Sequence, residues 1–566
     1  MDSIKTSKSE KAAYKKLWVF IFLAPFVFGG FHIAVSCVYS VVLLAFLCID
    51  CVLKKELTVK ISLPLLVSLV IFIGYFVSVF NAVDSGSAIY GVFKYLPVVL
   101  FALCIGDSQQ SDRDFLLSAI PLSAAVMTVV SYPLSFIDKL SEFFLVSGRL
   151  GGFFQYPNTY AVFCLAGIII SLTKSKLTLK DAVVSAILLA GVLLSGSRSV
   201  FVLLIITAVV FVFKLKNKKQ KILIITAVAV GLIASVVTVV LTDSIQNAGR
   251  FITISLNSST FLGRILYWVD ALPVILKHPL GLGYNGYYYA QQEFQTGVYS
   301  VMFIHNDVLQ YLLDIGWVPT LAFVVGIIVS FFSKKTSFRQ KFLLFILSAH
   351  LMFDFDMQFI AMGFLFVLIL DWDSFEFKEL KIKPLAIYSV CAVSVIPVIF
   401  FGLVNFFSLT GNYVAVDRLY PHDTSAQTQL MIEEGYSDTA IAYAESIIKR
   451  NGYSSVAHTV LANSKYAQGD IAEYIKEKRK ALEISKYSID EYNDFAYKLM
   501  SAAQQYRAYG DIVSAEYCEK EIKNLQSKLK TVEKETNSLA WKIADKPVLT
   551  LDSDITEYLE SMEGER

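Results

Sequence analysis

Three arginines and a histidine stand in short polar clusters between long apolar segments: Arg149, Arg198, Arg264 and His305. A guanidinium group binds phosphate oxygens through two parallel hydrogen bonds, which the ammonium group of lysine cannot form. A histidine exchanges protons near neutral pH, because its unperturbed pKa is about 6.5. Gathered on one side of a helix bundle, these groups would bind a multiply charged anion and take a proton beside it.

Polar and aromatic residues accompany these four groups. Asn158 follows Arg149 ahead of an apolar run, and Asn306 follows His305. Trp268 and Tyr284 lie near Arg264 in a segment rich in tyrosine, and such rings stack on sugars. Taken singly, each feature has an ordinary structural explanation, such as an interfacial arginine, an aromatic belt or a helix cap. The combination favours a binding site for a lipid diphosphate that carries sugars.

The composition divides the chain into a membrane body and a polar domain. Of its 566 residues, 55% are hydrophobic and only 17% are charged, whereas soluble domains carry about 25% charged residues. Long apolar runs fill residues 17–407, and residues 408–566 are polar. We therefore expect an all-α, polytopic transmembrane bundle followed by a soluble helical-repeat domain. The net charge of +2 gives no indication of nucleic-acid binding.

A spanning helix needs about 20 apolar residues, and thirteen segments are candidates, with twelve spans as the alternative. The candidates are 17–30, 33–53, 61–80, 90–106, 114–135, 159–173, 182–195, 199–213, 222–242, 316–333, 342–355, 357–371 and 384–407.

Basic residues predict the orientation of these spans. The loops assigned inside carry 24 lysines and arginines, and those assigned outside carry six. The positive-inside rule then places residues 1–16 in the cytoplasm. The large loop 243–315, which contains His305, is expected outside, together with the domain that follows residue 407.

The polar domain has the pattern of stacked helices. Residues 408–535 contain helical stretches of about 12–20 residues separated by short breaks with Gly or Asp. The spacing of small and aromatic residues resembles tetratricopeptide helix pairs, which usually bind a protein partner, and a plain helical bundle is the alternative. Residues 536–566 are acidic and are expected to be a flexible tail.

Metal and cofactor motifs give no clear signal. No P-loop, HExxH or Cys/His cluster occurs, and the seven cysteines suggest no disulfide framework. Acidic triplets begin at Asp354, Asp371 and Asp552, and we interpret them as incidental, although Asp354 would face the external side and touch a polar substrate. We therefore expect neither a metal nor a cofactor.

The polar clusters, in this order, resemble the O-antigen ligase and Wzy-type polymerase superfamily of membrane glycosyltransferases. The matching stretches are RxxGxFxxPN at 149–158, SxSR at 195–198, GRxxxW at 263–268, PLGLGY at 279–284 and HNDxLQxLLDIG at 305–316. The resemblance is strongest over residues 140–330. The soluble C-terminal domain departs from the best-known members.

The resemblance implies a metal-independent, inverting glycosyl transfer at the outer face of a bacterial plasma membrane. The donor would be a glycan on undecaprenyl diphosphate, and the acceptor a glycan, lipid or protein. Arg198 and Arg264 would hold the diphosphate and stabilise the leaving group, with Arg149 as a secondary contact. His305 would orient or deprotonate the acceptor hydroxyl.

A second class of function stays open at this point. A transporter or channel for an anionic or lipid-linked substrate would place ionisable residues inside its spans. Lys94, Asp270 and Asp314 lie near apolar segments, but the sequence shows no internal repeat. A scaffold that acts through its C-terminal domain is a third reading.

Overall fold

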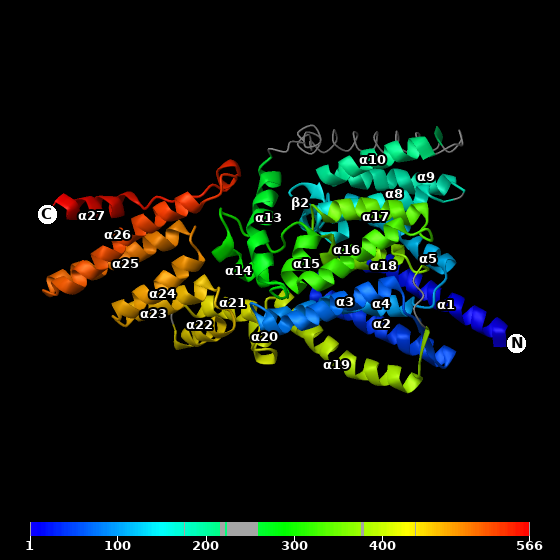
Figure 1. The fold of residues 1–566 in the computed structure, drawn as a ribbon, viewed down its shortest axis with the longest axis horizontal. Helices are drawn as coiled ribbons and strands as arrows, with labels where there is room; N and C mark the ends of the chain where they lie inside the picture. Colours follow the sequence, from blue (N-terminus) through cyan, green and yellow to red (C-terminus); the bar gives the residue numbers. More distant parts are fainter. Residues whose placement is uncertain are drawn as a thin grey trace. The chain divides into compact units, whose positions relative to one another are not determined.

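The computed structural model describes residues 2–174, 176–214, 221–222, 258–374, 379–435 and 437–564. Helices make up nearly all of its regular structure, as predicted, and the strands of the described part form only two short ribbons (Figure 1). The chain divides into two compact units. The first comprises Met1–Val77, Ile89–Ser255 and Ile304–Leu409, and the second comprises Ser78–Ala88, Leu256–Phe303 and Thr410–Arg566.

The first unit is a bundle of apolar helices. Helix α2 packs along α19, and α8 packs against α6, α9, α10 and α17, so that α8 lies at the centre of the bundle. Nearly every residue of α8 is buried. The helices are α1 (Asp2–Leu23), α2 (Ile33–Lys54), α3 (Leu63–Ser78), α4 (Ser85–Cys104), α5 (Gln110–Leu117), α6 (Ala119–Leu134), α7 (Asp138–Phe144), α8 (Pro157–Leu172), α9 (Leu179–Leu194), α10 (Arg198–Lys214), α15 (Asp307–Ile315), α16 (Trp317–Phe332), α17 (Phe338–Leu351), α18 (Ile360–Ile369) and α19 (Pro384–Leu409).

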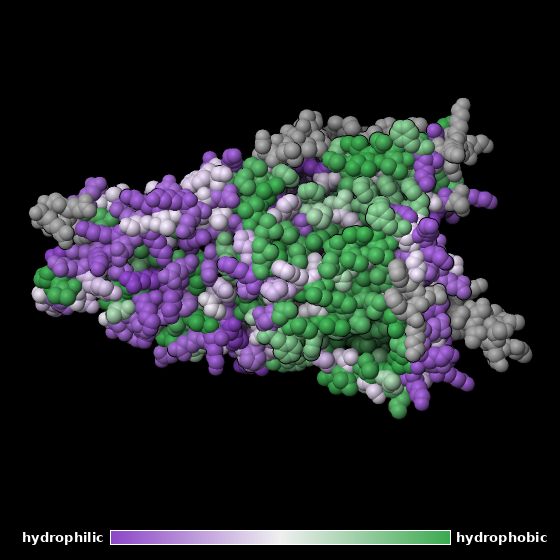
Figure 2. Space-filling view, in the orientation of Figure 1, coloured by the Kyte–Doolittle hydropathy of each residue, from purple (hydrophilic) through white to green (hydrophobic). Residues whose placement is uncertain are grey.

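The number of apolar helices indicates a multi-pass membrane protein. Within the described residues, six helical segments are long and apolar enough to cross a membrane, and α8, α16 and α18 are shorter apolar helices. Each predicted span in the described part overlaps a helix, although several of these helices are shorter than a full span. The predicted span 222–242 lies almost wholly outside the described residues. Figure 2 shows hydrophobic residues over the flanks of this bundle.

Several loops that the charge pattern assigns to one side meet in the structure. Strand β1 (Leu57–Lys60) pairs antiparallel with β4 (Glu379–Ile382), which joins two of these loops. Lys54 forms an ion pair of 2.5 Å with Asp107, and Arg113 forms one of 2.6 Å with Asp373. These contacts agree with a common side for the loops, and the identity of that side stays a prediction.

The second unit contains α13 (Ser259–Lys277), α14 (Gly286–Phe294) and the C-terminal helices. Successive C-terminal helices pack as neighbouring pairs, and Figure 2 shows mainly hydrophilic residues over this part. Their resemblance to tetratricopeptide repeats stays a prediction. These helices are α20 (Tyr413–Leu419), α21 (Thr424–Glu434), α22 (Asp438–Arg450), α23 (Ser455–Ala467), α24 (Ile471–Ile484), α25 (Ile489–Ala508), α26 (Ile512–Glu535) and α27 (Ser553–Gly564).

The Gly and Asp breaks between these helices have a physical explanation. Gly469 and Gly510 each have a φ of 79°, a left-handed conformation that ends a helix at little cost for glycine. The next residues, Asp470 and Asp511, accept hydrogen bonds from the backbone N–H groups of Glu473 and Ser514 and so cap α24 and α26. A Gly-Asp pair therefore stops one helix and starts the next.

The C-terminal segment 536–566, expected to be flexible, contains ordered structure. Ile555 and Leu559 of α27 are buried in a core that includes Leu499 and Cys518. Asn537 donates from its backbone N–H to the Thr296 carbonyl oxygen at 2.9 Å. The segment is acidic overall, but it contains a few apolar residues at helical spacing. These residues pack into the core and hold the segment in place.

The second unit also takes in residues that we expected to belong to the membrane body. Asp84 accepts a hydrogen bond from Thr424 Oγ1, and the Tyr420 hydroxyl donates to the Gly86 carbonyl oxygen at 3.0 Å. Helix α13 lies within the segment 243–315 that we expected to be a loop, and it is itself apolar enough to be a candidate span. The compact units therefore cut across the predicted domain boundary at residue 407.

Candidate active site

A two-residue β-hairpin presents Arg149. Strands β2 (Leu145–Val146) and β3 (Arg149–Leu150) pair antiparallel, with Val146 opposite Arg149. The connecting Ser147 and Gly148 have φ values of 50° and 71°. Positive φ at both turn residues matches the twist of the flanking strands. The SGR sequence thus fixes the backbone from which this guanidinium extends.

The start of α8 supplies two partners. Pro157 occupies the first turn of the helix, where its missing N–H costs nothing. Tyr156 and Asn158 therefore flank the helix start. Asn158 is buried, and its Oδ1 accepts a hydrogen bond of 2.6 Å from Nη2 of Arg149. Nε of Arg149 donates to the Ser195 carbonyl oxygen at 2.8 Å, so the guanidinium bridges the hairpin, α8 and the SGSR turn.

Asp354, in the loop after α17, completes this network. Its side chain is fully buried, and its Oδ2 accepts a hydrogen bond of 2.7 Å from Nδ2 of Asn158. Its Oδ1 accepts one of 2.6 Å from the Tyr156 hydroxyl and lies 3.4 Å from Nδ1 of His305. A buried carboxylate requires such donors, because leaving it unpaired costs several kcal/mol. The carboxylate thus links Arg149, through Asn158, to His305.

His305 sits in an unusual backbone conformation. Its φ is 54°, in the left-handed region that non-glycine residues seldom adopt. The imidazole lies 5.0 Å, between ring centroids, from Phe355, and the side chain is 23% exposed. Such strain tends to occur at functional sites, where the surrounding structure holds it. With Nδ1 directed to Asp354, Nε2 is the nitrogen that faces away from the carboxylate.

Asn306 fixes the residue beside the histidine. Its Oδ1 accepts a hydrogen bond of 3.0 Å from the Leu309 N–H and caps α15, and its Nδ2 donates to the Met352 carbonyl oxygen at 2.9 Å. Both ends of the amide are therefore used by the fold. This geometry favours a positioning role for Asn306, and the predicted contact of Asn306 with substrate stays a prediction.

A second layer of buried polar groups lies beneath the site. Asp356 accepts a hydrogen bond of 2.7 Å from Thr159 Oγ1, and its other oxygen lies 2.5 Å from Nδ1 of His350. Asp307 accepts a hydrogen bond from the Met357 N–H at 3.0 Å, and burial together with the Asp356 carboxylate raises its pKa. These contacts tie the starts of α8 and α15 to the loop 352–359. Among the described residues, no group of three or more histidine, cysteine or carboxylate side chains forms a metal site.

The structure divides the other predicted site residues between the two units. Arg198 is the first residue of α10, three residues after the carbonyl group that Arg149 contacts, and it is half-buried. Arg264 and Trp268 lie on α13 in the second unit, with Tyr284, which is buried. The first unit therefore brings together Arg149, Asn158, His305 and the Arg198 turn, and the approach of Arg264, Trp268 and Tyr284 to this group stays a prediction.

Ionisable residues that suggested a transporter have local structural partners. Lys94 donates hydrogen bonds to the carbonyl oxygens of Gly30 and Phe31. Asp314 accepts from Gln310 and Tyr75. Asp270 accepts from Thr296 and Tyr299 inside the second unit. These side chains hold neighbouring segments together, and none of these contacts indicates a conduction path.

The comparison with known protein families covers the centre of the chain. Residues 183–324 match the family model of the O-antigen ligase domain. Over these residues the chain is similar to the O-antigen ligase domain of the Wzy type. The match to the O-antigen ligase domain includes Arg198, Arg264 and His305, whereas Arg149, Asn158 and Asp354 lie outside the matched residues. No curated protein and no solved structure matches the chain.

The O-antigen ligase domain, set among apolar helices, identifies a multi-pass membrane protein of the glycosyl-transferring kind, with a role in polysaccharide assembly. The match to this family implies a lipid-linked glycan as donor and a glycan as acceptor.

Proposed function

We propose that the protein transfers or polymerises a glycan from a polyprenyl diphosphate carrier to an acceptor hydroxyl, at the extracytoplasmic face of a bacterial plasma membrane. The observation that carries the proposal is the contact of His305 Nδ1 with the buried Asp354 carboxylate, within hydrogen-bond reach of the Arg149–Asn158 pair. A bacterial envelope and an external site follow from the resemblance and from the distribution of lysines and arginines.

The proposed reaction needs one base and a stabilised leaving group. The acceptor oxygen attacks the anomeric carbon of the donor, the bond from that carbon to the diphosphate oxygen breaks, and polyprenyl diphosphate leaves with the electron pair. His305 Nε2 takes the acceptor proton, and Asp354 stabilises the resulting imidazolium. Attack opposite the leaving group inverts the anomeric carbon.

Arg198 and Arg264 are assigned to the diphosphate. Their charge stabilises the negative charge that develops on the leaving group, which removes the need for a metal ion in this proposal. Arg149 already bonds Ser195 and Asn158, so its main role is to hold the SGSR turn and the carboxylate network in register. Trp268 and Tyr284 are assigned to sugar rings of the donor.

Mass spectrometry of lipid-linked and surface glycans from cells that lack the protein tests this function. Accumulation of single lipid-linked repeat units would identify a polymerase, and accumulation of long lipid-linked chains would identify a ligase. Unchanged lipid-linked and surface glycans would contradict the proposal. Solute flux in donor-free proteoliposomes would instead favour the transporter alternative.

A further inference from the structure

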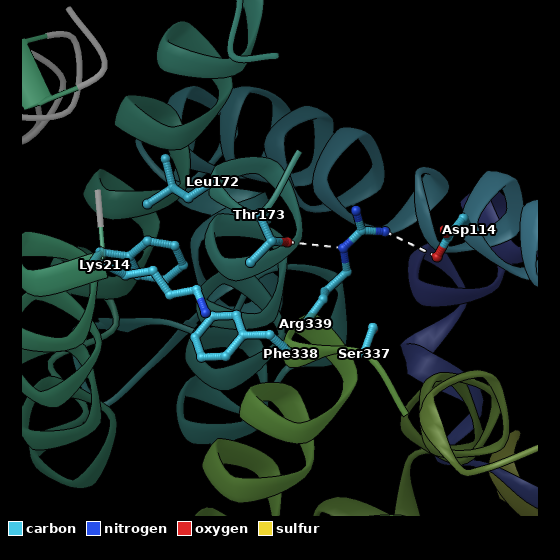
Figure 3. Close-up of a pocket in the computed structure, with 8 residues that line it drawn as sticks. Asp114, Leu172, Thr173, Lys214, Ser337, Phe338 and Arg339 are labelled. Atoms are coloured by element: carbon cyan, nitrogen blue, oxygen red, sulfur yellow. Dashed lines mark hydrogen bonds and ion pairs between the residues drawn. The ribbon is translucent and has the colours of Figure 1, made fainter. Parts of the chain in front are cut away.

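A basic cavity lies in the first unit, away from the residues around His305. It has a volume of about 350 Å³ and is formed by the ends of α5, α8 and α10 and by the start of α17 (Figure 3). Its lining consists of Asp114, Leu172, Thr173, Phe211, Lys214, Ser337, Phe338 and Arg339. These elements border loops that the charge pattern assigns to the inner side, whereas His305 is assigned to the outer side.

The two cations of the cavity are held in place differently. Arg339 donates from Nε to Thr173 Oγ1 at 2.9 Å and from Nη1 to Asp114 Oδ1 at 3.1 Å, as Figure 3 shows. Nη2 of Arg339 takes part in neither of these bonds. Lys214 lies with Nζ 3.4 Å from the centroid of the Phe338 ring and has no ion pair with a described carboxylate. One carboxylate thus faces two cations, and the lining carries a net positive charge.

The surface beside the cavity is apolar. On α10, Phe213 is 84% exposed and Val212 is 59% exposed, and on α17 Phe345 is 43% exposed. Phe211 of α10 packs against Phe342 of α17 with ring centroids 5.9 Å apart, so the two helices form one continuous wall. A ligand whose anionic group enters the cavity can therefore lay an apolar chain along these helices.

We propose that this cavity binds the phosphate headgroup of an anionic phospholipid. Arg339 and Lys214 contact the phosphate oxygens, and the acyl chains lie against α10 and α17. Basic pockets between membrane helices bind such headgroups, because the cations lie at the depth of the lipid phosphates. This site is independent of the proposed glycosyl transfer, since none of its residues belongs to the His305 network.

Native mass spectrometry of the full-length protein in detergent tests the site. Phosphatidylglycerol and phosphatidylcholine are titrated against the wild type, Lys214→Gln, Arg339→Gln and the double variant. We expect preferential retention of phosphatidylglycerol by the wild type and a roughly fivefold loss of apparent affinity for each removed cation. Lys335→Gln is the matched control. Lys335 is an exposed lysine in the loop between α16 and α17, and it does not line the cavity.

Each outcome bears on the proposal. Equal phosphatidylglycerol binding by the wild type and the double variant would overturn it, as would an equal loss in Lys335→Gln. If inorganic phosphate displaces the lipid completely at matched concentration, the ligand is a free anion and the lipid assignment fails. Arg339→Gln also removes contacts with Thr173 and Asp114, so Lys214→Gln, which removes an exposed side chain, decides the result if Arg339→Gln unfolds.

Discussion

The carboxylate of Asp354 lies 3.4 Å from Nδ1 of His305, although 49 residues separate the two in the chain. The same oxygen accepts the Tyr156 hydroxyl, and the other accepts Asn158, so the buried carboxylate is held from two sides. This arrangement fixes the direction in which the imidazole points. The proposed reaction depends on this pairing as much as on the histidine itself.

Replacement of the carboxylate tests the pairing. Asp354→Asn keeps the shape but removes the negative charge that stabilises the imidazolium, so we expect transfer to fall by roughly 10²-fold or more. The rate of lipid-linked glycan consumption by the purified variant measures this. Asp138→Asn, a change of an exposed carboxylate at the start of α7, is the control. Wild-type turnover by a folded Asp354→Asn protein would argue against the assigned role.

We expect Arg149 and Asn158 to contribute jointly to stability through the hydrogen bond between them. Arg149→Lys keeps the charge but cannot contact both Ser195 and Asn158 through a planar fork. Asn158→Ala removes the link from the other side. A double-mutant cycle on thermal stability should give a coupling of about 1.5–3 kcal/mol, the range for a hydrogen bond to a charged group. Additive effects of the two changes would show that the bond has no energetic role.

Because Asp314 is buried, we expect the free energy of unfolding to depend on pH. Burial raises the pKa of this carboxyl to about 7, against 3.8 for an exposed aspartate. As the pH rises above 4, the unfolded state ionises first, so the folded state loses stability progressively up to pH 7 and stays at the lower level above it. Asp314→Asn should therefore raise the unfolding temperature at pH 8 more than at pH 5.

Thermal unfolding in detergent across this pH range checks the Asp314 prediction. Asp138→Asn again serves as the control, because its exposed carboxylate has no comparable burial. An identical pH profile for wild type and Asp314→Asn would mean that another group causes the dependence.

The order of the C-terminal segment is testable through its buried side chains. Leu559 is 5% exposed within the core of the second unit. Leu559→Ala should cost about 2–5 kcal/mol locally and expose residues 536–564 to protease. Limited proteolysis of the full chain, followed by mass spectrometry of the fragments, measures this. The control Val548→Ala changes an exposed residue of the same segment, and equal cleavage in both variants would contradict the packing described.

The sequence predicted the helices well, because apolar runs and Gly-Asp breaks are local signals. From their motifs we also assigned Arg149, Asn158 and His305 to one site. The structure links these side chains through Asp354, and their roles in binding and catalysis stay predictions. The sequence did not predict the partner of His305, because Asp354 stands in an apolar segment and resembles an incidental acidic triplet. Only the folding of α17 back towards α8 brings that carboxylate to Asn158.

Local sequence signals also did not predict how the chain divides into two compact units. Residues 78–88 join the second unit through contacts such as that of Thr424 with Asp84, which depend on segments 340 positions apart. The acidic segment after residue 535 looked mobile because Ile555 and Leu559 are too few to give a clear period. Long-range packing, and not local propensity, decided both outcomes.

The central claim is that His305 acts with the arginines on a lipid-linked diphosphate. The most direct test is the rate at which purified wild type, His305→Ala, Arg198→Gln and Arg264→Gln release polyprenyl diphosphate from a lipid-linked glycan, measured by mass spectrometry. We expect a loss of roughly 10²-fold or more in each folded variant. Release at the wild-type rate by His305→Ala and both arginine variants would contradict it.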